Sequence, residues 1–248
     1  MKVSPITRNY YANSSPMFGS TTRVVHKSGF KMYANFTEFL RPDFPWKPFI
    51  DLVEQKYRNV PKINILNFAC SDGSEPYTLA MLLKDRFGNN ANRFFPIKAY
   101  DFDEDIIDLA KEKTINFGPD DLYRLSQEVP NWEKDYFKII RTSLFGPDRK
   151  ITPRNSIKNA VEFEQKELPK DFPKEKLTNT IVFARNFWPY MERMNYKVLA
   201  IMMAEILDDT CLVALGALEK TFQIGKLLEK EGFIKTNVDS VYTLPKKS

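Results

Sequence analysis

Residues 63–88, INILNFACSDGSEPYTLAMLLKDRFG, decide the fold of this chain. The stretch opens with a short apolar run that predicts a buried strand, and it then breaks into a small polar turn over residues 69–73. A helix is expected from about Ser74, with Ser or Asp as its N-cap and Gly88 as its stop. A strand, a turn of small residues and the start of a buried helix place free backbone N–H groups beside a cavity. This is how α/β folds hold a nucleotide-like cofactor.

Taken alone, the same stretch also fits an ordinary turn in any α/β enzyme. It has neither the G-x-G-x-x-G pattern of dinucleotide-binding folds nor the Gly-Lys-Ser/Thr of a P-loop. A phosphate cradle is therefore not expected, and the neighbouring motifs must decide which ligand the turn serves.

Length and composition fit a soluble globular protein. The chain has 248 residues, of which 43% are hydrophobic and 28% charged, so it can form one α/β domain with a short extension. It has no run of about 18 apolar residues and no apolar N-terminal segment, so neither a membrane span nor a secretory signal is expected. Cys70 and Cys211 are expected to be buried free thiols in a cytoplasmic protein. With one histidine, His26, no metal site is predicted.

Positive charge is concentrated at the start of the chain. Residues 1–50 hold seven Lys and Arg against Glu38 and Asp43, so this region carries the whole net charge of +5. The excess favours an acidic partner, or it belongs to a solvated tail. Residues 1–34 are interpreted as a basic, aromatic arm, and residues 35–248 as one domain.

The rest of the chain alternates strands with helices, which predicts a doubly wound, mostly parallel α/β sheet. Residues 233–234 and 241–244 are expected to close a C-terminal antiparallel hairpin, and residues 138–163 are compatible with a small β insertion. Strands are expected at 96–101, 180–184 and 211–216, and helices at 35–41, 49–57, 103–111, 122–137 with an interruption at Pro130, 192–207 and 222–231.

Several polar residues stand where the strands end. Asp101 suits a ribose-binding acid or a helix N-cap, although Asp103 suits the cap better. Glu75 either faces a cationic ligand group or complements the helix dipole. Arg185 and Asn186 directly follow an apolar strand, which favours a ligand site over a place in the core. The aromatic residues after them, Phe187, Trp188 and Tyr190, either wall a pocket or pack.

Several of these segments resemble one known family. FACSDGSEPYTLAMLL is similar to the cofactor loop of the chemotaxis receptor methyltransferases, the CheR family, which reads A-x-S-x-G-x-E-P-Y-S-x-A. NFTEFLR, AYDFDEDIIDLAKE, DYF, VFARNFWPYM and ALGALE resemble further motifs of that family. The matches occur in family order over about residues 33–244. The resemblance implies a Rossmann-like class I methyltransferase fold.

It also implies S-adenosyl-L-methionine as cofactor, S-adenosyl-L-homocysteine as product, and a glutamate carboxylate on an acidic, chemoreceptor-like helix as acceptor. A sulfonium is already activated and a carboxylate is already a nucleophile at neutral pH, so the protein mainly positions them. Carried over residue by residue, the cofactor would be bound by Asn35, Thr37, Arg41, Ala69, Gly73, Glu75, Asp101, Glu167, Leu168, Arg185 and Asn186, with Arg41, Arg185 and Tyr190 closest to the chemistry.

The chain also departs from the family. Only 34 residues precede Asn35, where the family has a basic helical domain that docks the receptor, and Glu167 stands where the family has Asn. Two alternatives therefore stay open: methylation of a small molecule or another protein group, and a non-catalytic cofactor-binding relative. Nucleic-acid methylation is not expected, because the N/D-P-P-Y/F loop of amine methyltransferases is missing and the basic excess is confined to the arm.

Overall fold

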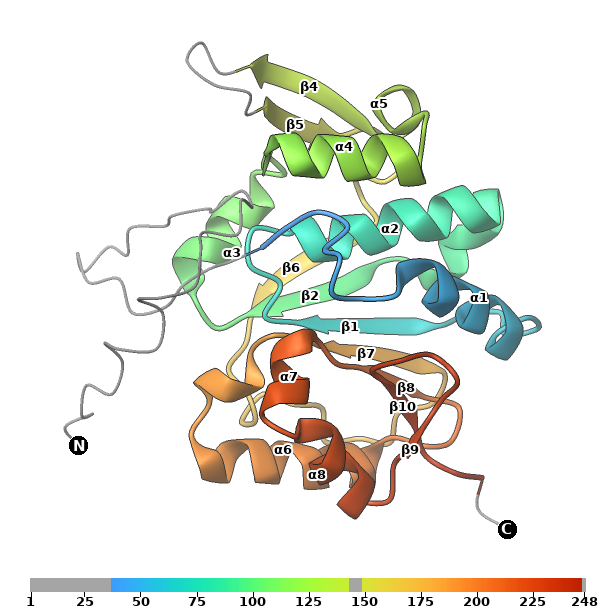
Figure 1. Cartoon of the computed structure of the whole chain (residues 1–248), viewed down its shortest axis with the longest axis vertical. Coiled ribbons are helices and arrows are strands. Elements are labelled where there is room, and N and C mark those ends of the chain that lie inside the picture. Colours follow the sequence, from blue (N-terminus) through green and yellow to red (C-terminus); the bar gives the residue numbers. More distant parts are fainter. Residues whose placement is uncertain (1–36, 143–148, 247–248) are drawn as a thin grey trace, which may run out of the picture.

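A seven-stranded sheet forms the centre of the molecule (Figure 1). The computed structural model describes residues 37–142 and 149–246. Across the sheet the order is β6 (Val161–Gln165), β2 (Ile97–Asp101), β1 (Asn64–Phe68), β7 (Thr180–Ala184), β8 (Leu212–Ala214), β10 (Val241–Thr243) and β9 (Ile234–Lys235). Five neighbouring strands run parallel, and the sixth, β10, pairs antiparallel both with the last of them, β8, and with the edge strand β9.

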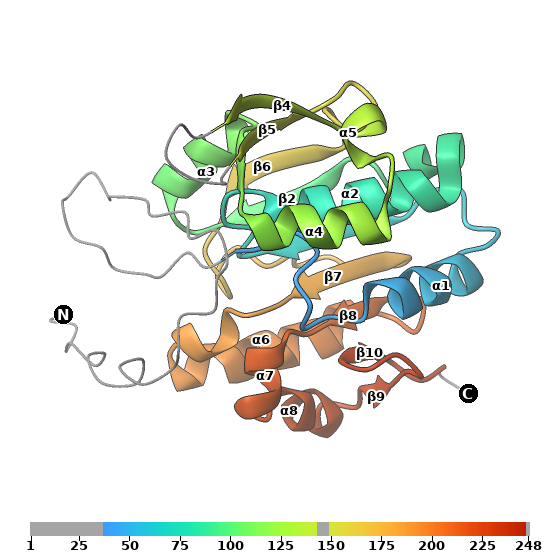
Figure 2. The same cartoon turned by 45° about the horizontal axis from the view of Figure 1, so that its top comes forward.

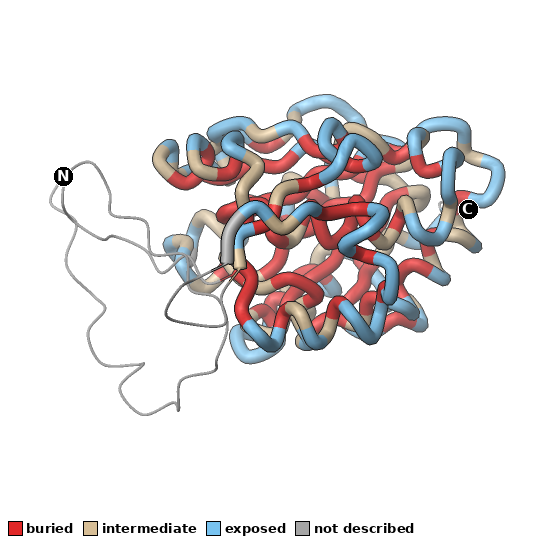
Figure 3. Tube along the Cα trace, turned by 90° about the horizontal axis from the view of Figure 1, so that it is seen from above, coloured by how far each residue is buried: buried red, intermediate tan, exposed pale blue. Residues whose placement is uncertain are grey.

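Helices cover both faces of this sheet (Figure 2). Successive strand residues alternate between two cores: Ile65 packs in the core beneath the first group of helices, and Leu66 in the core beneath the second. The first group is α1 (Trp46–Lys56), α2 (Ser74–Phe87) and α3 (Glu104–Lys111), and the second is α6 (Arg193–Ile206) and α8 (Ile224–Lys230). Figure 3 shows the buried residues gathered in the interior of the molecule and the exposed residues at its periphery. The predicted doubly wound, mostly parallel fold with a C-terminal antiparallel hairpin is confirmed.

A second, three-stranded antiparallel sheet lies beside α4 (Pro119–Glu128) and α5 (Trp132–Asp135). Its order is β3 (Ile115–Phe117), β5 (Arg149–Pro153) and β4 (Phe137–Thr142). A small β insertion was expected within residues 138–163. In the structure β5 lies inside this range and β4 overlaps its start, whereas β3 precedes it and β6, at its end, belongs to the main sheet. Phe117, Trp132 and Phe137 pack against one another with ring centroids 6.0–6.5 Å apart, which gives the small sheet an aromatic core.

Some expected elements have different bounds. The expected helix start at 35–41 is wrong over its described part, because Leu40 has a left-handed backbone (φ 47°) and the N–H groups of Phe39 and Leu40 donate to the side chains of Asp121 and Thr78. The helix expected over 222–231 is observed as α8, which begins two residues later, after the left-handed Gln223, and a separate short helix, α7 (Ala217–Thr221), precedes it. Two short 3₁₀ helices, η1 (Gly88–Phe94) and η2 (Trp188–Tyr190), complete the elements described.

Both cysteines are buried and free, as predicted. Burial raises the pKa of the Cys211 thiol to about 11 and that of Cys70 well above its ordinary value, so neither is a reactive thiolate near neutral pH. Over the described residues, no helix combines the length and the apolar character that crossing a membrane requires.

Candidate active site

The carboxyl ends of the five parallel strands meet at one edge of the sheet, and the predicted site residues cluster there. Every such strand except β8 leads directly into a predicted residue. Ala69 and Gly73 follow β1, Asp101 ends β2, Glu167 and Leu168 follow β6, and Arg185 and Asn186 follow β7. Asn35 lies outside the described residues.

The turn after β1 has an unusual backbone. Ala69, Ser71 and Gly73 have φ values of 56°, 50° and 91°, in the left-handed region that side chains disfavour. Gly73 is required there twice over, because a Cβ atom at this position would also lie 2.9 Å from the ring of Phe163. Gly73 occupies the N-cap of α2, while Asp72 accepts a hydrogen bond from the N–H of Ser74 (3.0 Å).

Asp101 is held against this turn. Its Oδ2 accepts the N–H of Ser71 (3.0 Å) and its Oδ1 accepts the N–H of Asp103 (3.2 Å). Burial raises the pKa of Asp101 to about 6, although these two N–H groups oppose the shift. Asp103 is the N-cap of α3, as predicted, so Asp101 remains available to a ligand. The carboxylate has acceptor capacity beyond these backbone N–H groups, which suits a hydroxyl donor such as a ribose.

A buried cluster of charges forms around Arg185, whose side chain is 0% exposed. The guanidinium pairs with Glu75 through Nη1 and with Asp43 through Nη2 (2.7 Å). It also lies over the rings of Phe44 (4.4 Å) and Trp46 (5.3 Å). Asn67 Nδ2 donates to the other oxygen of Glu75 at 2.7 Å. Arg185 is thus fixed on two sides by carboxylates and on a third by aromatic rings.

The segment before α1 delivers a second arginine to this cluster. Arg41 Nε lies 3.3 Å from Asp43 Oδ2, so Asp43 bridges Arg41 and Arg185. The Arg41 side chain is 23% exposed, in contrast to the enclosed Arg185. Thr37, which precedes Arg41 in the same segment, is also buried. Phe39 anchors this segment by packing against Phe117 of the small sheet, with the ring centroids 4.8 Å apart.

Glu219 holds the loop after β7 in place. It is fully buried in α7 and accepts the N–H groups of Asn186 (2.8 Å), Phe187 (3.1 Å) and Gly216 (2.8 Å). Burial raises the pKa of Glu219, and these backbone donors counteract the shift. Asn186 itself is left-handed (φ 60°), and a side chain at position 216 would collide with its amide. Gly216 and Glu219, which belong to the ALGALE segment, therefore shape the Arg185–Asn186 corner.

Three other predicted residues lie at the same edge of the sheet. Glu167 is exposed and pairs with Lys170 (3.9 Å), while Leu168 packs on the apolar core beneath α6. Tyr190 lies in η2 and is 45% exposed, so its phenol is open to solvent. The recorded ion pair of Glu167 is thus with Lys170 and not with the Arg185 cluster.

The residues present fit S-adenosylmethionine. Seven buried side-chain polar atoms have no protein partner within the described residues, and four of them belong to this edge: Asn67 Oδ1, Ser71 Oγ, Tyr77 Oη and Arg185 Nε. Buried polar groups are normally hydrogen-bonded, so their concentration beside the turn marks a place where a polar ligand supplies partners. The amino-acid end of the cofactor carries both donors and acceptors, and its ribose carries hydroxyls that suit Asp101.

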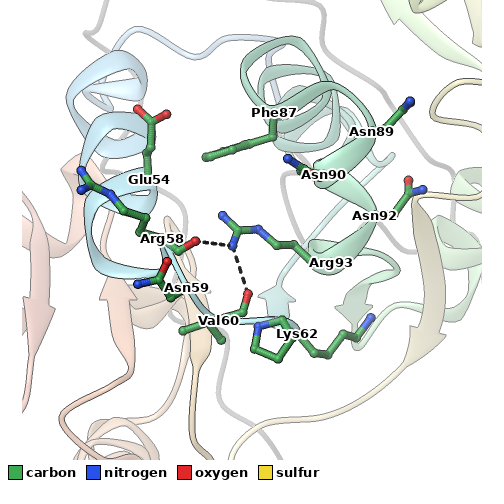
Figure 4. A pocket seen from close by; sticks show the side chains of 11 residues that line it. Glu54, Arg58, Asn59, Val60, Lys62, Phe87, Asn89, Asn90, Asn92 and Arg93 are labelled. Atoms are coloured by element: carbon green, nitrogen blue, oxygen red, sulfur yellow. Dashed lines mark hydrogen bonds between the residues drawn. The ribbon is translucent and has the colours of Figure 1, made fainter.

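Two cavities lie away from the charged cluster. One, of about 820 Å³, opens at the amino ends of β1 and β2 (Figure 4). There Arg93 Nη1 donates to the carbonyls of Tyr57, Arg58 and Val60 (2.7–3.2 Å), and its guanidinium lies over Phe87 and Phe94. Arg93 therefore ties two chain segments together. The second cavity, of about 750 Å³, is lined by β1, β2, β6 and residues 170–177, and none of its lining residues belongs to the charged cluster.

Sequence reasoning missed Asp43, Asn67 and Glu219 as site residues. Asp43 follows Arg41 in a Pro-rich break, and Asn67 is hidden inside the apolar run INILNF. The one signal for Asn67 was an amide at a position where strand alternation calls for an apolar side chain.

The fold, with its order of five parallel strands and an antiparallel hairpin, and the ligand-fitting edge define a Rossmann-like S-adenosylmethionine-binding domain of the methyltransferases. Residues 35–236 match the family model of the CheR methyltransferase, SAM binding domain. The match spans more than half of the chain, and the chain belongs to this family, whose cofactor is S-adenosylmethionine.

Individual relatives are more distant. A probable chemotaxis protein methyltransferase of Rhizobium etli is 27% identical over 163 residues, which cover 64% of this chain and 57% of that protein. Among solved structures, magnesium protoporphyrin IX methyltransferase of Synechocystis PCC 6803 with bound S-adenosylmethionine has a TM-score of 0.42 at 14% identity, covering 80% of this chain and 79% of that one. A TehB-like methyltransferase of Corynebacterium glutamicum has a TM-score of 0.39 at 11% identity, with 81% and 94% covered.

Proposed function

We propose that this protein transfers the methyl group of S-adenosylmethionine to a glutamate side-chain carboxylate of an acidic, chemoreceptor-like protein helix. The observation that carries the proposal is the pair of arginines at the carboxyl edge of the sheet, one enclosed and one open, joined by Asp43. A guanidinium that stays partly exposed beside the cofactor edge suits a carboxylate acceptor, which it can bind through two parallel N–H groups.

The two arginines take different roles in this proposal. Arg185 has no exposed surface and is held by Glu75 and Asp43, so it shapes the site and keeps Glu75 in place. Arg41 reaches solvent and binds the carboxylate of the incoming acceptor. It does so while its Nε remains paired with Asp43. Tyr190, which is exposed at the same edge, lines the entrance through which the acceptor side chain arrives.

The cofactor supplies the activated methyl group, and the chain supplies position. Glu75 and Asp101 bind its amino and ribose groups, and the Asn186 corner, fixed by Glu219, forms one wall. A carboxylate nucleophile is ionised at neutral pH, so the transfer needs no proton removal by a side chain. Alignment of the reacting atoms at about 3 Å in a site that excludes water then accounts for the rate.

Two measurements test the proposal. Calorimetric titration with S-adenosylhomocysteine should give micromolar binding that Asp101→Ala loses. Incubation with methyl-tritiated cofactor and the helical cytoplasmic fragment of a chemoreceptor should then label the fragment with a base-labile methyl ester, which releases methanol at high pH. Label that resists base would place the methyl group on nitrogen or another atom and contradict the glutamate acceptor. Binding without any label on the fragment would contradict the chemoreceptor assignment.

A further inference from the structure

Asn67 occupies a position that strand alternation assigns to the core. It lies on the central strand β1, on the same side as Ile65, and pairs in register with Ala99 of β2 and Phe183 of β7. The side chain is 0% exposed. A buried amide among apolar side chains is unfavourable unless its polar atoms are hydrogen-bonded, so this residue needs an explanation beyond packing.

Of the two polar atoms of the Asn67 amide, one has a hydrogen-bond partner within the described residues and the other has none. Nδ2 donates to Glu75 Oε1 at 2.7 Å, and a carboxylate can accept only from that end of the amide, which fixes the orientation of the group. Oδ1 is buried and has no partner within the described residues. The other oxygen of Glu75 is taken by Arg185, whose Nε is also buried and unpartnered in the same part of the structure. The two residues that bind Glu75 thus each keep one unused polar atom: Asn67 has a free acceptor, Oδ1, and Arg185 has a free donor, Nε.

The charge balance explains why an amide stands here. Two carboxylates, Asp43 and Glu75, already face the two guanidinium groups of Arg41 and Arg185. A third carboxylate at position 67 would lie beside Glu75 and repel it, whereas an amide orients Glu75 and offers an oxygen without adding charge. An ammonium group has three donors, so a carboxylate oxygen and an amide oxygen side by side suit it well.

We propose that Asn67 is a positioning residue that aims Glu75 at the amino group of the cofactor's methionine end and offers its own Oδ1 to the same group. The inference rests on the proposed function, because it concerns the same cofactor. It adds a residue that sets affinity for the amino-acid end and leaves the nucleoside end unaffected, since the nucleoside end is assigned to Asp101, which ends β2 and is held by the N–H of Ser71.

The test compares two ligands that share a nucleoside. S-adenosylhomocysteine carries the amino-acid end, and 5′-methylthioadenosine lacks it. Both are titrated calorimetrically into the full-length protein, its Asn67→Ser variant, and the matched control Asn64→Ser, which changes an exposed Asn at the start of the same strand. We expect Asn67→Ser to bind S-adenosylhomocysteine about tenfold more weakly and 5′-methylthioadenosine within about twofold of the wild type. Asn64→Ser should change neither affinity.

The outcomes separate the possible failures. If Asn67→Ser weakens both ligands equally, or neither, the positioning role is overturned. If the wild type binds no S-adenosylhomocysteine, the proposed function itself fails. Should Asn67→Ser not fold, Asn67→Ala decides, with the same selective loss expected because alanine has neither the donor for Glu75 nor the free Oδ1. Failure of both variants to fold would show that Asn67 serves the core alone, and would overturn the proposal.

Discussion

Asp101, to which we assign the ribose of the cofactor, is buried, and burial makes the charge of its carboxylate sensitive to pH. Its pKa of about 6 lies above the ordinary value of 3.8 because burial disfavours the charged form. The ionised form is the better acceptor for ribose hydroxyls, so cofactor affinity should rise as pH rises through 6.

We expect affinity for S-adenosylhomocysteine to fall roughly tenfold from pH 7 to pH 5, as the ionised fraction of Asp101 falls with a pKa near 6. Calorimetric titrations across this range measure the effect. Asp101→Asn, which cannot ionise, should bind more weakly at pH 7 and show little of this slope. An equal slope in the variant would assign the titration to another group.

The same shift affects the stability of the ligand-free protein with the opposite sign. Because the folded-state pKa is raised, the proton on Asp101 stabilises the fold fully below about pH 4, and this stabilisation is lost as pH rises through about 6. Asp101 is therefore a residue whose charge helps binding and weakens the unliganded fold.

Among the elements, the short helix α7 acts through its single buried acid. Glu219→Ala would leave the N–H groups of Asn186, Phe187 and Gly216 without their acceptor, so we expect a loss of about 2–3 kcal/mol in the free energy of unfolding. Glu219→Gln keeps one acceptor oxygen and should lose less. Urea denaturation measures both.

The control for this prediction is Glu229→Ala, which changes an acid of α8 that pairs with Lys235 at the surface (3.7 Å). Its effect should stay within about 0.5 kcal/mol, because exposed ion pairs contribute little. Equal stability of the Glu219 and Glu229 variants would show that the loop after β7 does not depend on Glu219.

Elements with strong local signals were predictable, and those fixed by distant partners were not. The five-residue apolar run TIVFA predicted β7 to its bounds, and Gly88 marked the end of α2. Residues 37–41 were misread because their N–H groups are taken by Asp121 and Thr78, far along the chain. Strand β3 has three residues, too few to show the alternation of apolar and polar side chains that predicts a strand. Its pairing partner is β5, which lies far along the chain.

The site followed the same rule. Arg185, Asn186, Asp101 and Glu75 stand at strand ends or at a helix start, where sequence position alone indicates a ligand. Asp43 becomes significant only because the fold brings it to Arg185, 142 positions away. Asn67 likewise needs the start of α2 to lie against β1 before its amide has a partner.

For the whole molecule, the distribution of charge predicts how an acidic partner arrives. The excess positive charge belongs to the first 50 residues, and the remainder is neutral. We expect the methylation rate of an acidic helical acceptor at limiting concentration to fall roughly tenfold between 50 and 500 mM salt, because screening weakens long-range attraction.

Affinity for S-adenosylhomocysteine, whose amino and carboxyl charges cancel, should change less than about twofold over the same range. Radiometric methylation assays and calorimetry in matched buffers provide the comparison. A parallel decline of both quantities would indicate that salt acts on the domain itself and not on the encounter with the acceptor.

The ion pair between Asp43 and Arg185 also affects the order in which the chain folds. Closing a loop of 142 residues is entropically unfavourable, and contacts of such sequence separation form late. The first strand and helix can associate while much of the chain is still being synthesised, but the arginine of β7 must emerge before the N-terminal carboxylate can meet it. Cofactor capture by a newly made chain therefore reports that the whole sheet has assembled, and a truncated product ending before β7 cannot sequester the cofactor.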